Sequence, residues 1–331
     1  MSDIVVAPEG LGPQLREAYA RSGMDRGVPD PDTDLLAHWF PDEHPAFAVA
    51  RKDGEIVGVS AYLHHRFALG TQDGRAAQAI DSFVFPEARG GGVFHRLAEC
   101  YRDFSRDSRT DLIWGFPNEN ARRAWFGKQG WTPHGQLPYL IRPLRTGVVA
   151  RRIGLPLDLP VMFARDRDLP PVTEAGDWAD VAWDRLRPAI GCARVRDRHY
   201  LARRVFGIPG RYRTVVGGDA SNPAYATSHI AHKHGGTLGY LMEAMGEPGA
   251  LKDMLTSELA RLRDQGAEAA LAYAYPWSPN YRALRRAGFV PLPERLRPIR
   301  IWFGSFALNA RSRTALDRRS WYLSYLDSDT V

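Results

Sequence analysis

Cysteine is scarce in this sequence of 331 residues, which contains only Cys100 and Cys192. The two lie far apart and have no partners at metal-ligand spacing, so the sequence offers neither a disulfide framework nor a zinc motif. An apolar run of membrane-spanning length and a signal-peptide pattern are also missing. We therefore expect a cytoplasmic protein with no metal and no membrane span.

Basic runs are absent as well. Lysine and arginine number 44 against 38 acidic residues, a formal net charge of +6, yet no five basic residues are consecutive. This argues against nucleic acid as a partner. A diffuse positive excess instead suits an anionic ligand such as a nucleotide or a pyrophosphate. The length favours two domains, and 44% apolar with 25% charged residues is typical of globular proteins.

The two familiar phosphate-binding motifs are absent too, because neither the nucleoside-triphosphate loop nor the dinucleotide fingerprint fits the glycine-rich stretch. That stretch reads FVFPEARGGGVFHRLAE, from Phe83 to Glu99. A strand leads into three glycines and then into a helix, whose first backbone N–H groups and dipole attract phosphate. Glycines let the anion approach without a Cβ, and Arg89 adds a charged donor. The alternative is a tight connection that binds nothing.

Apolar periodicity predicts the same order of elements in both halves: a hairpin, a strand, a helix, a buried strand and a short helix closed by glycine and an aromatic residue. In the first half these segments are 45–69, 77–85, the helix ending near 105, 110–116 and 117–131. In the second half they are strands 212–216, 224–232 and 237–244, the helix 249–265, the buried strand 270–276 and the short helical segment 278–289. The repeat indicates duplication of one α/β unit, of which only the first copy has the glycine turn. A proline- and arginine-rich linker is predicted between them.

The glycine turn resembles the acetyl-CoA-binding motif of the GNAT acyltransferase superfamily, Arg/Gln-x-x-Gly-x-Gly/Ala after a bulged strand. Arg89 and Gly92 match, and Phe94 departs from the final Gly or Ala. GFPNENARRAWFGKQGW, residues 115–131, is similar to the second GNAT signature, and WYLSYLDSDTV, residues 321–331, resembles the end of a branch with two tandem GNAT-like units.

The resemblance implies an α/β protein of two tandem GNAT-like units, each a mixed central sheet flanked by helices. Residues 1–145 would bind acetyl-CoA or another acyl-CoA as co-substrate, 146–171 would be the linker, and 172–331 would be a degenerate unit that shapes the acceptor site. The residues implied to hold the coenzyme are Phe83, Val84, Arg89, Gly90, Gly91, Gly92, Val93, Phe94, Asn118, Asn120 and Phe126. For the two asparagines a helix-cap role is an equal alternative.

Acyl transfer to an amine requires removal of the amine's proton, stabilisation of an oxyanion and departure of a thiolate. Many GNAT enzymes protonate the thiolate with a tyrosine at the position that Phe126 occupies here, so this acid is missing. Asp81, in the apolar stretch AIDSFVF, is the best candidate base, and pairing with an arginine is its alternative role. His65 and Glu119 are further candidates.

The sequence thus predicts N-acylation of a primary amine on a small molecule, with an amino sugar or a nucleotide-linked amino sugar as the expected acceptor. Two other classes stay open: a Fem-type aminoacyl transferase that uses charged tRNA, and a non-catalytic module that binds coenzyme A. The sequence leaves open whether the protein forms a homodimer.

Overall fold

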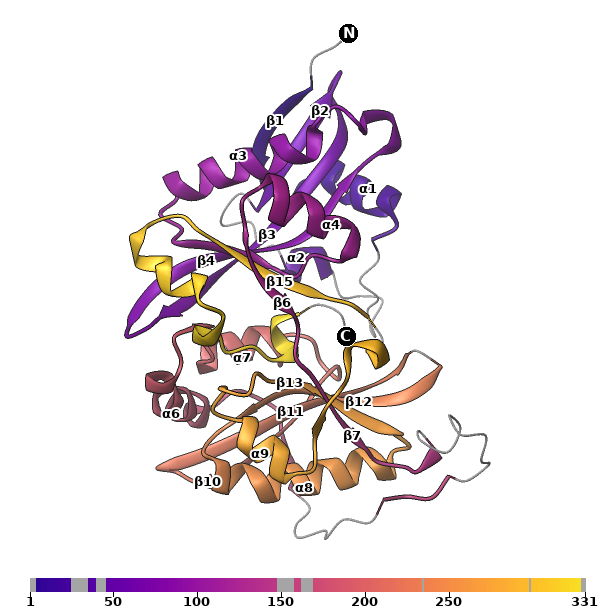
Figure 1. The fold of residues 1–331 in the computed structure, drawn as a ribbon, viewed down its shortest axis with the longest axis vertical. Coiled ribbons are helices and arrows are strands. Elements are labelled where there is room, and N and C mark those ends of the chain that lie inside the picture. The colour runs from indigo at the N-terminus through magenta and orange to yellow at the C-terminus, as the bar shows by residue number, and fades with distance from the viewer. Residues whose placement is uncertain are drawn as a thin grey trace. The chain divides into compact units, whose positions relative to one another are not determined.

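The computed structural model describes residues 4–24, 35–39, 46–147, 158–161, 169–233, 235–297 and 299–328. The chain forms two compact units, one of residues 1–136 with 301–318 and the other of residues 137–300 with 319–331. Each unit has its own mixed β-sheet with helices against it (Figure 1). The predicted fold class is confirmed.

The first unit is built on a sheet of the order β1-β2-β3-β4-β5-β15-β6. Its strands are β1 (Val5–Glu9), β2 (Phe47–Lys52), β3 (Glu55–Leu69), β4 (Gln72–Val84), β5 (Leu112–Gly115), β15 (Trp302–Ala307) and β6 (Thr132–Gln136). Along this order, β4 and β5 are parallel and the other described pairs are antiparallel. Helix α1 (Pro13–Ser22) packs with α2 (Leu35–Trp39) on one face, and α3 (Val93–Asp107) packs on the other, giving two apolar cores.

The second unit repeats this plan with the order β14-β7-β13-β12-β11-β10-β8. Its strands are β14 (Val290–Pro291), β7 (Tyr139–Pro143), β13 (Ala269–Tyr273), β12 (Gly236–Met245), β11 (Asn222–Lys233), β10 (Arg213–Asp219) and β8 (Pro171–Val172). The short strand β9 (Cys192–Arg194) is not part of this sheet. The helices of the second unit are α6 (Asp177–Leu186), α7 (Arg198–Arg204), α8 (Pro248–Asp264) and α9 (Tyr281–Arg286). Again one pair, β12 with β13, is parallel.

The two units exchange strands. β15 comes from near the end of the chain and lies between β5 and β6 of the first sheet, while β7 lies between β14 and β13 of the second. The compact units therefore differ from the contiguous division at residues 145 and 171, because each takes a strand from the other's stretch of sequence. Much of the predicted linker, residues 148–157 and 162–168, lies outside the described residues.

Most predicted local elements are present at or near their expected places. The turn Asp53-Gly54 joins β2 to β3 with positive φ at both residues, as a tight hairpin requires. β4 begins earlier than predicted, and the short helix after β5 divides into α4 (Glu119–Arg123) and one π-helical turn, Ala124–Lys128. Gly130, with a φ of +71°, ends that segment as predicted.

Candidate active site

In the first unit the pairing of β4 with β5 ends before β4 does. Their parallel pairing ends at Ala79 and Gly115, while β4 continues along β3 to Val84. Between Ala79 and Ser82, β4 contains one residue more than β3 offers opposite, which is a β-bulge and re-aims the strand. A Cβ at Gly115 would lie 2.6 Å from the carbonyl oxygen of Ala79, so glycine is needed where the strands diverge. The bulged strand that the motif implied is present.

The glycine turn lies at the end of this strand. After the 3-10 turn Pro86–Ala88, Gly90 and Gly92 have φ values of +86° and +71°, and α3 begins at Val93. Gly92 is the N-cap residue and has no side chain to satisfy the first amides of the helix. Across the described residues, no backbone hydrogen bond is donated by the amides of Gly90 to Phe94. Exposed amides at a helix start are suited to bind an anion.

Gly91 is the informative glycine of the three. Its φ is not positive, so conformation does not require glycine there, and a Cβ would meet no atom within 4 Å. Gly90 and Gly92 also face open space, but their left-handed conformation explains them without a ligand. Gly91 is exposed and unexplained by the protein's own packing. With no Cβ, Gly91 leaves the space beside the turn open to a bound group.

The end of β4 offers backbone groups on its β5 side. The N–H of Phe85 donates to the carbonyl of Val57 (2.9 Å), so by antiparallel alternation Phe83 pairs with β3 and Val84 faces the β5 side. Arg89 donates from Nε to the Val84 carbonyl (3.0 Å). Phe83 and Val84 were both implied to hold the coenzyme arm. The register favours Val84, because its backbone groups face away from β3.

The residues after β5 begin a helix. Asn118 is its N-cap, and its Oδ1 accepts from the N–H of Ala121 at 2.9 Å, which confirms the cap role that was one of its two predicted functions. Glu119 accepts from Nε1 of Trp302 (2.7 Å) and pairs with Arg122 (2.8 Å). Both carboxylate oxygens of Glu119 therefore have donors, which fits anchoring of β15 better than proton abstraction. Asn120 is exposed.

Phe126 lies in the π-helical turn and packs against the core beneath α3. A Cβ at Gly304 of β15 would overlap its ring, so glycine at that position makes room for Phe126. The ring has no hydroxyl to protonate a leaving thiolate. Its position therefore supports packing, and its predicted coenzyme contact stays a prediction.

Asp81 lies in the bulge of β4 and is half-buried. Its Oδ2 accepts a hydrogen bond from Oη of Tyr19 (3.1 Å), a buried residue of α1. The bulge thus directs Asp81 to the α1 face of the sheet. Tyr19, which sequence reasoning missed, is the group that positions it. The only available signal was an aromatic residue in a short helix, which ordinarily indicates core packing.

The candidate histidines do not gather at Asp81. His65 pairs with Ala76, about four residues from the bulge, which is roughly 13 Å along the sheet. His64 faces the opposite side and lies 2.5 Å from the hydroxyl of Tyr101 in α3. His95 lies 2.5 Å from Nε2 of Gln129 and 3.2 Å from Glu99. Asp81 and His65 therefore share a face but cannot act on one atom.

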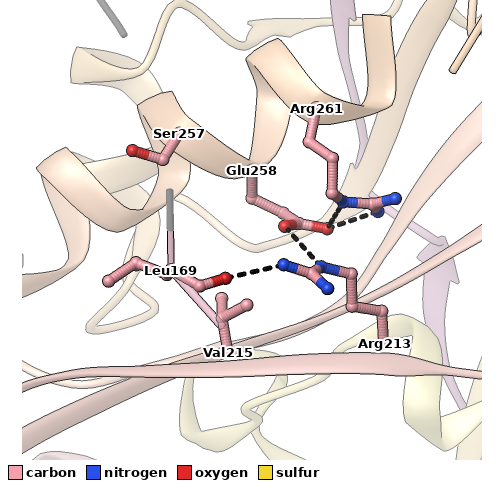
Figure 2. Close-up of a pocket in the computed structure, with 6 residues that line it drawn as sticks. All are labelled: Leu169, Arg213, Val215, Ser257, Glu258 and Arg261. Atoms are coloured by element: carbon pink, nitrogen blue, oxygen red, sulfur yellow. Dashed lines mark hydrogen bonds and ion pairs between the residues drawn. The ribbon is translucent and has the colours of Figure 1, made fainter. Parts of the chain in front are cut away.

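A small pocket in the second unit has a different character. It is lined by Leu169, Arg213, Val215, Ser257, Glu258 and Arg261. Figure 2 shows Arg213 and Arg261 both directed at the carboxylate of Glu258, at 3.4 and 2.5 Å, while Arg213 also donates to the carbonyl of Leu169 at 2.7 Å. Its charged groups satisfy one another, so the pocket is a packed ion-pair cluster between α8 and β10.

The connection from β12 to α8, which corresponds to the glycine turn, is not suited to bind an anion. Gly246 lies so close to Ala224 of β11 that a Cβ would overlap it. Glu247 follows as the N-cap of α8, paired with Arg185 at 3.4 Å, and Pro248 removes one of the first amides of the helix. An acidic cap and a missing donor both disfavour phosphate. The predicted difference between the halves is confirmed at this position.

Among the described residues, no helix is long and apolar enough to cross a bilayer. In the same residues no group of three or more histidine, cysteine, aspartate or glutamate side chains is arranged to hold a metal ion.

Residues 13–131 match the model of the acetyltransferase (GNAT) family. No curated protein matches. The fold is similar to a crystallised GCN5-related N-acetyltransferase from Anabaena variabilis ATCC 29413, with a TM-score of 0.64 and 12% identity over 93% of this chain and 73% of that one. A second such protein, from Kribbella flavida, matches over the same shares with a TM-score of 0.56 and 14% identity. The stretch that matches the GNAT family model contains the bulged strand, the glycine turn and the end of the β4–β5 pairing.

Proposed function

We propose that this protein transfers an acyl group from acyl-CoA to a primary amine of a small molecule, and that the first unit holds the donor. GNAT enzymes use acetyl-CoA as co-substrate. The observation that carries the proposal is the glycine turn, where the amides of Gly90 to Phe94 donate no backbone hydrogen bond within the described part of the chain and the exposed Gly91 leaves the space beside them open. Arg89 and Gly90 to Phe94 would hold the pyrophosphate, and the backbone of Val84 would hold the pantetheine arm.

Bound acyl-CoA supplies a thioester carbonyl as the electrophile. Asp81 is the proposed base, which takes the proton from the amine. The hydrogen bond from Tyr19 to Oδ2 of Asp81 fixes the orientation of the carboxylate. The N–H of Val84, on the β5 side of β4, is the proposed donor to the developing oxyanion. A thiol with a solution pKa of about 8.5 is acidic enough for its thiolate to depart without being protonated by an enzyme group. Phenylalanine at position 126 is therefore compatible with turnover.

For the acceptor we propose an amino sugar, free or linked to a nucleotide. The support is the resemblance of residues 321–331 to the tandem branch and the excess of arginine in the chain. The proposed role of the second unit is to shape the acceptor site. A panel of amino sugars, nucleotide-linked amino sugars, other amines and charged tRNA, assayed by release of free thiol, tests this choice. Turnover only with tRNA would overturn it.

The donor site is tested by Gly91→Leu. A Cβ there meets no atom within 4 Å and the position requires no positive φ, so we expect Gly91→Leu to fold, with its side chain in the space above the amides. We expect affinity for acetyl-CoA, measured by calorimetry, to fall at least about 100-fold. Gly249→Leu is the matched control, because Gly249 is also exposed, free of neighbours and in the first turn of a helix. Unchanged affinity in Gly91→Leu would contradict the assignment.

A further inference from the structure

The second unit has the same strand arrangement as the first. The parallel pairing of β12 with β13 ends at Tyr240 and Leu271, while β12 continues along β11 to Met245. β12 also has a bulge, since Leu241 and Glu243 pair with the adjacent residues Ser228 and Thr227. The unit therefore retains the bulge and the early end of parallel pairing seen in the first unit, although its β12–α8 connection is not suited to bind an anion.

That space is filled by the chain itself. We call Trp321–Ser328 the C-terminal segment; each of its eight residues is no more than 3% exposed. Tyr325 stacks on Tyr273, the last residue of β13, with ring centroids 3.6 Å apart. It also packs edge-on against Tyr240, the last β12 residue paired with β13, at 5.4 Å. The ring of Tyr325 thus lies where the two strands diverge.

The polar groups of the segment are bound to β12. Glu243 accepts from the hydroxyls of Tyr322 (2.5 Å) and Ser324 (2.8 Å). Arg196, which is fully buried, donates to Glu243 at 3.1 Å and to Asp327 at 2.5 Å. Burial opposes the charge of Arg196, but the two carboxylates raise its pKa above the usual value. The segment is therefore tied to β12 through a buried ionic network.

The backbone of β12 is satisfied as well. The N–H of Ala244 donates to Glu243 Oε1, and its carbonyl accepts from Nδ2 of Asn280, both at 3.0 Å. Asn280 is the N-cap residue of α9. In the first unit the side of β4 that faces β5 presents Val84, whose carbonyl is held by the exposed Arg89. The amide partners that an incoming pantetheine would need are thus already taken in the second unit.

From outside, α7 holds the segment's main chain. Arg204 donates to the carbonyls of Leu326 and Ser328, each at 3.2 Å, and Tyr200 donates to that of Leu326 at 3.3 Å. Side chains on both sides therefore bind the segment along its length, as a protein binds a peptide ligand.

We propose that the C-terminal segment is a built-in occupant of the second unit's donor cleft, in the place that the coenzyme arm takes in the first unit, so that each chain binds one acyl-CoA. The stoichiometry rests on the proposed function; the occupancy of the cleft does not. The second unit would thereby be a GNAT-like scaffold that has exchanged a diffusible ligand for a covalently attached one.

Two measurements on the full chain test this. Calorimetry should give one acetyl-CoA per chain, and none in Gly91→Leu. A second molecule bound per chain, surviving in Gly91→Leu, would overturn the proposal. Absence of any binding in the wild type would instead contradict the proposed function, without testing whether the C-terminal segment occupies the second unit.

Hydrogen exchange tests that occupancy directly. The backbone amides of residues 322–328 should exchange as slowly as those of β12 and β13, with or without acetyl-CoA. Rapid exchange of these amides, or loss of their protection when acetyl-CoA is added, would refute the proposed occupancy.

Two variants of Tyr325 test whether its ring fills the space between β12 and β13. Tyr325→Phe keeps the ring and should leave the melting temperature within about 2 °C, whereas Tyr325→Ala removes it and should lower the melting temperature by roughly 10 °C. Hydrogen exchange of Tyr325→Ala should show faster exchange in both the C-terminal segment and the end of β12. Equal melting temperatures in the two variants would contradict an occupant role.

Discussion

At the scale of single residues, buried polar groups set how the fold responds to pH. His134 in β6 is 3% exposed, and its Nε2 lies 2.8 Å from Oγ of Ser305 in β15. Burial lowers the pKa of His134 to about 4 from the ordinary 6.5. Between about pH 6.5 and pH 4, His134 is therefore protonated in the unfolded chain but neutral in the folded protein. Stability must fall as the pH falls through that window.

The prediction is that wild type loses roughly 2 kcal/mol more than His134→Gln between about pH 6.5 and pH 5. Glutamine can keep a hydrogen bond to Ser305 but does not titrate. Urea unfolding at the two pH values measures the difference. His229, whose pKa burial also lowers, remains in both proteins and so cancels. An identical pH dependence of the two proteins would show that His134 titrates normally in the fold.

Asp81 and Tyr19 give a second prediction. Asp81→Asn should lower kcat by about 100- to 10,000-fold and remove the acidic limb of the pH profile, with affinity for acetyl-CoA unchanged. Tyr19→Phe, which removes the hydrogen bond to Asp81, should shift that limb and lower kcat less. Asp103→Asn serves as control, because Asp103 is exposed on α3 and pairs only with Arg106. A pH profile unaffected by Asp81→Asn would exclude it as the base.

At the scale of elements, the divergence of β4 and β5 depends on Gly115. A Cβ there would lie 2.6 Å from the backbone oxygen of Ala79, which cannot move without shifting β4. Gly115→Ala should therefore cost about 1–3 kcal/mol of stability and weaken binding of acetyl-CoA. Gly127→Ala is the control, since Gly127 has no neighbour within 4 Å. Chemical denaturation measures the change in stability, and calorimetry measures the change in acetyl-CoA binding. If Gly115→Ala changed neither, the divergence of β4 and β5 would not depend on Gly115.

Elements with strong local signals were predicted well from the sequence. The hairpin of β2 and β3, the start of α3 and the glycine that ends the segment after α4 depend on turn residues and caps that lie within a few positions of each other. The candidate site was predicted in part for the same reason, because the glycine turn is contiguous. Tyr19 was missed since its partner Asp81 is 62 residues away.

At the scale of the whole molecule, the sequence could not show which sheet each strand joins. Nothing in Trp302–Ala307 distinguishes a strand of the second unit from one inserted between β5 and β6. The buried network is equally non-local, since Arg196 binds carboxylates 47 and 131 residues away. Periodicity specifies that a strand is buried on a face, whereas its neighbours are decided by tertiary packing.

Strand exchange yields a prediction about fragments. Residues 1–157 alone lack β15, which leaves β5 and β6 without their shared neighbour, and residues 158–331 alone lack β7. Each fragment should be insoluble or unfolded by circular dichroism when expressed alone, whereas co-expressed fragments should purify as a complex that binds acetyl-CoA. A well-folded, soluble 1–157 would contradict the importance of the exchange. A chain cut in the same place after folding is the control for the break itself.

The late position of β15 also has a consequence for synthesis. About 170 residues separate β6 from β15, and a ribosome adds roughly 5–20 residues per second, so the gap corresponds to roughly 10–35 s. During that interval the nascent chain exposes the edges of β5 and β6, which stay uncovered until β15 has been synthesised. Such edges invite pairing with other chains. Production of this protein in a foreign host should therefore be limited by chaperone supply while translation is under way, more than by the stability of the finished molecule.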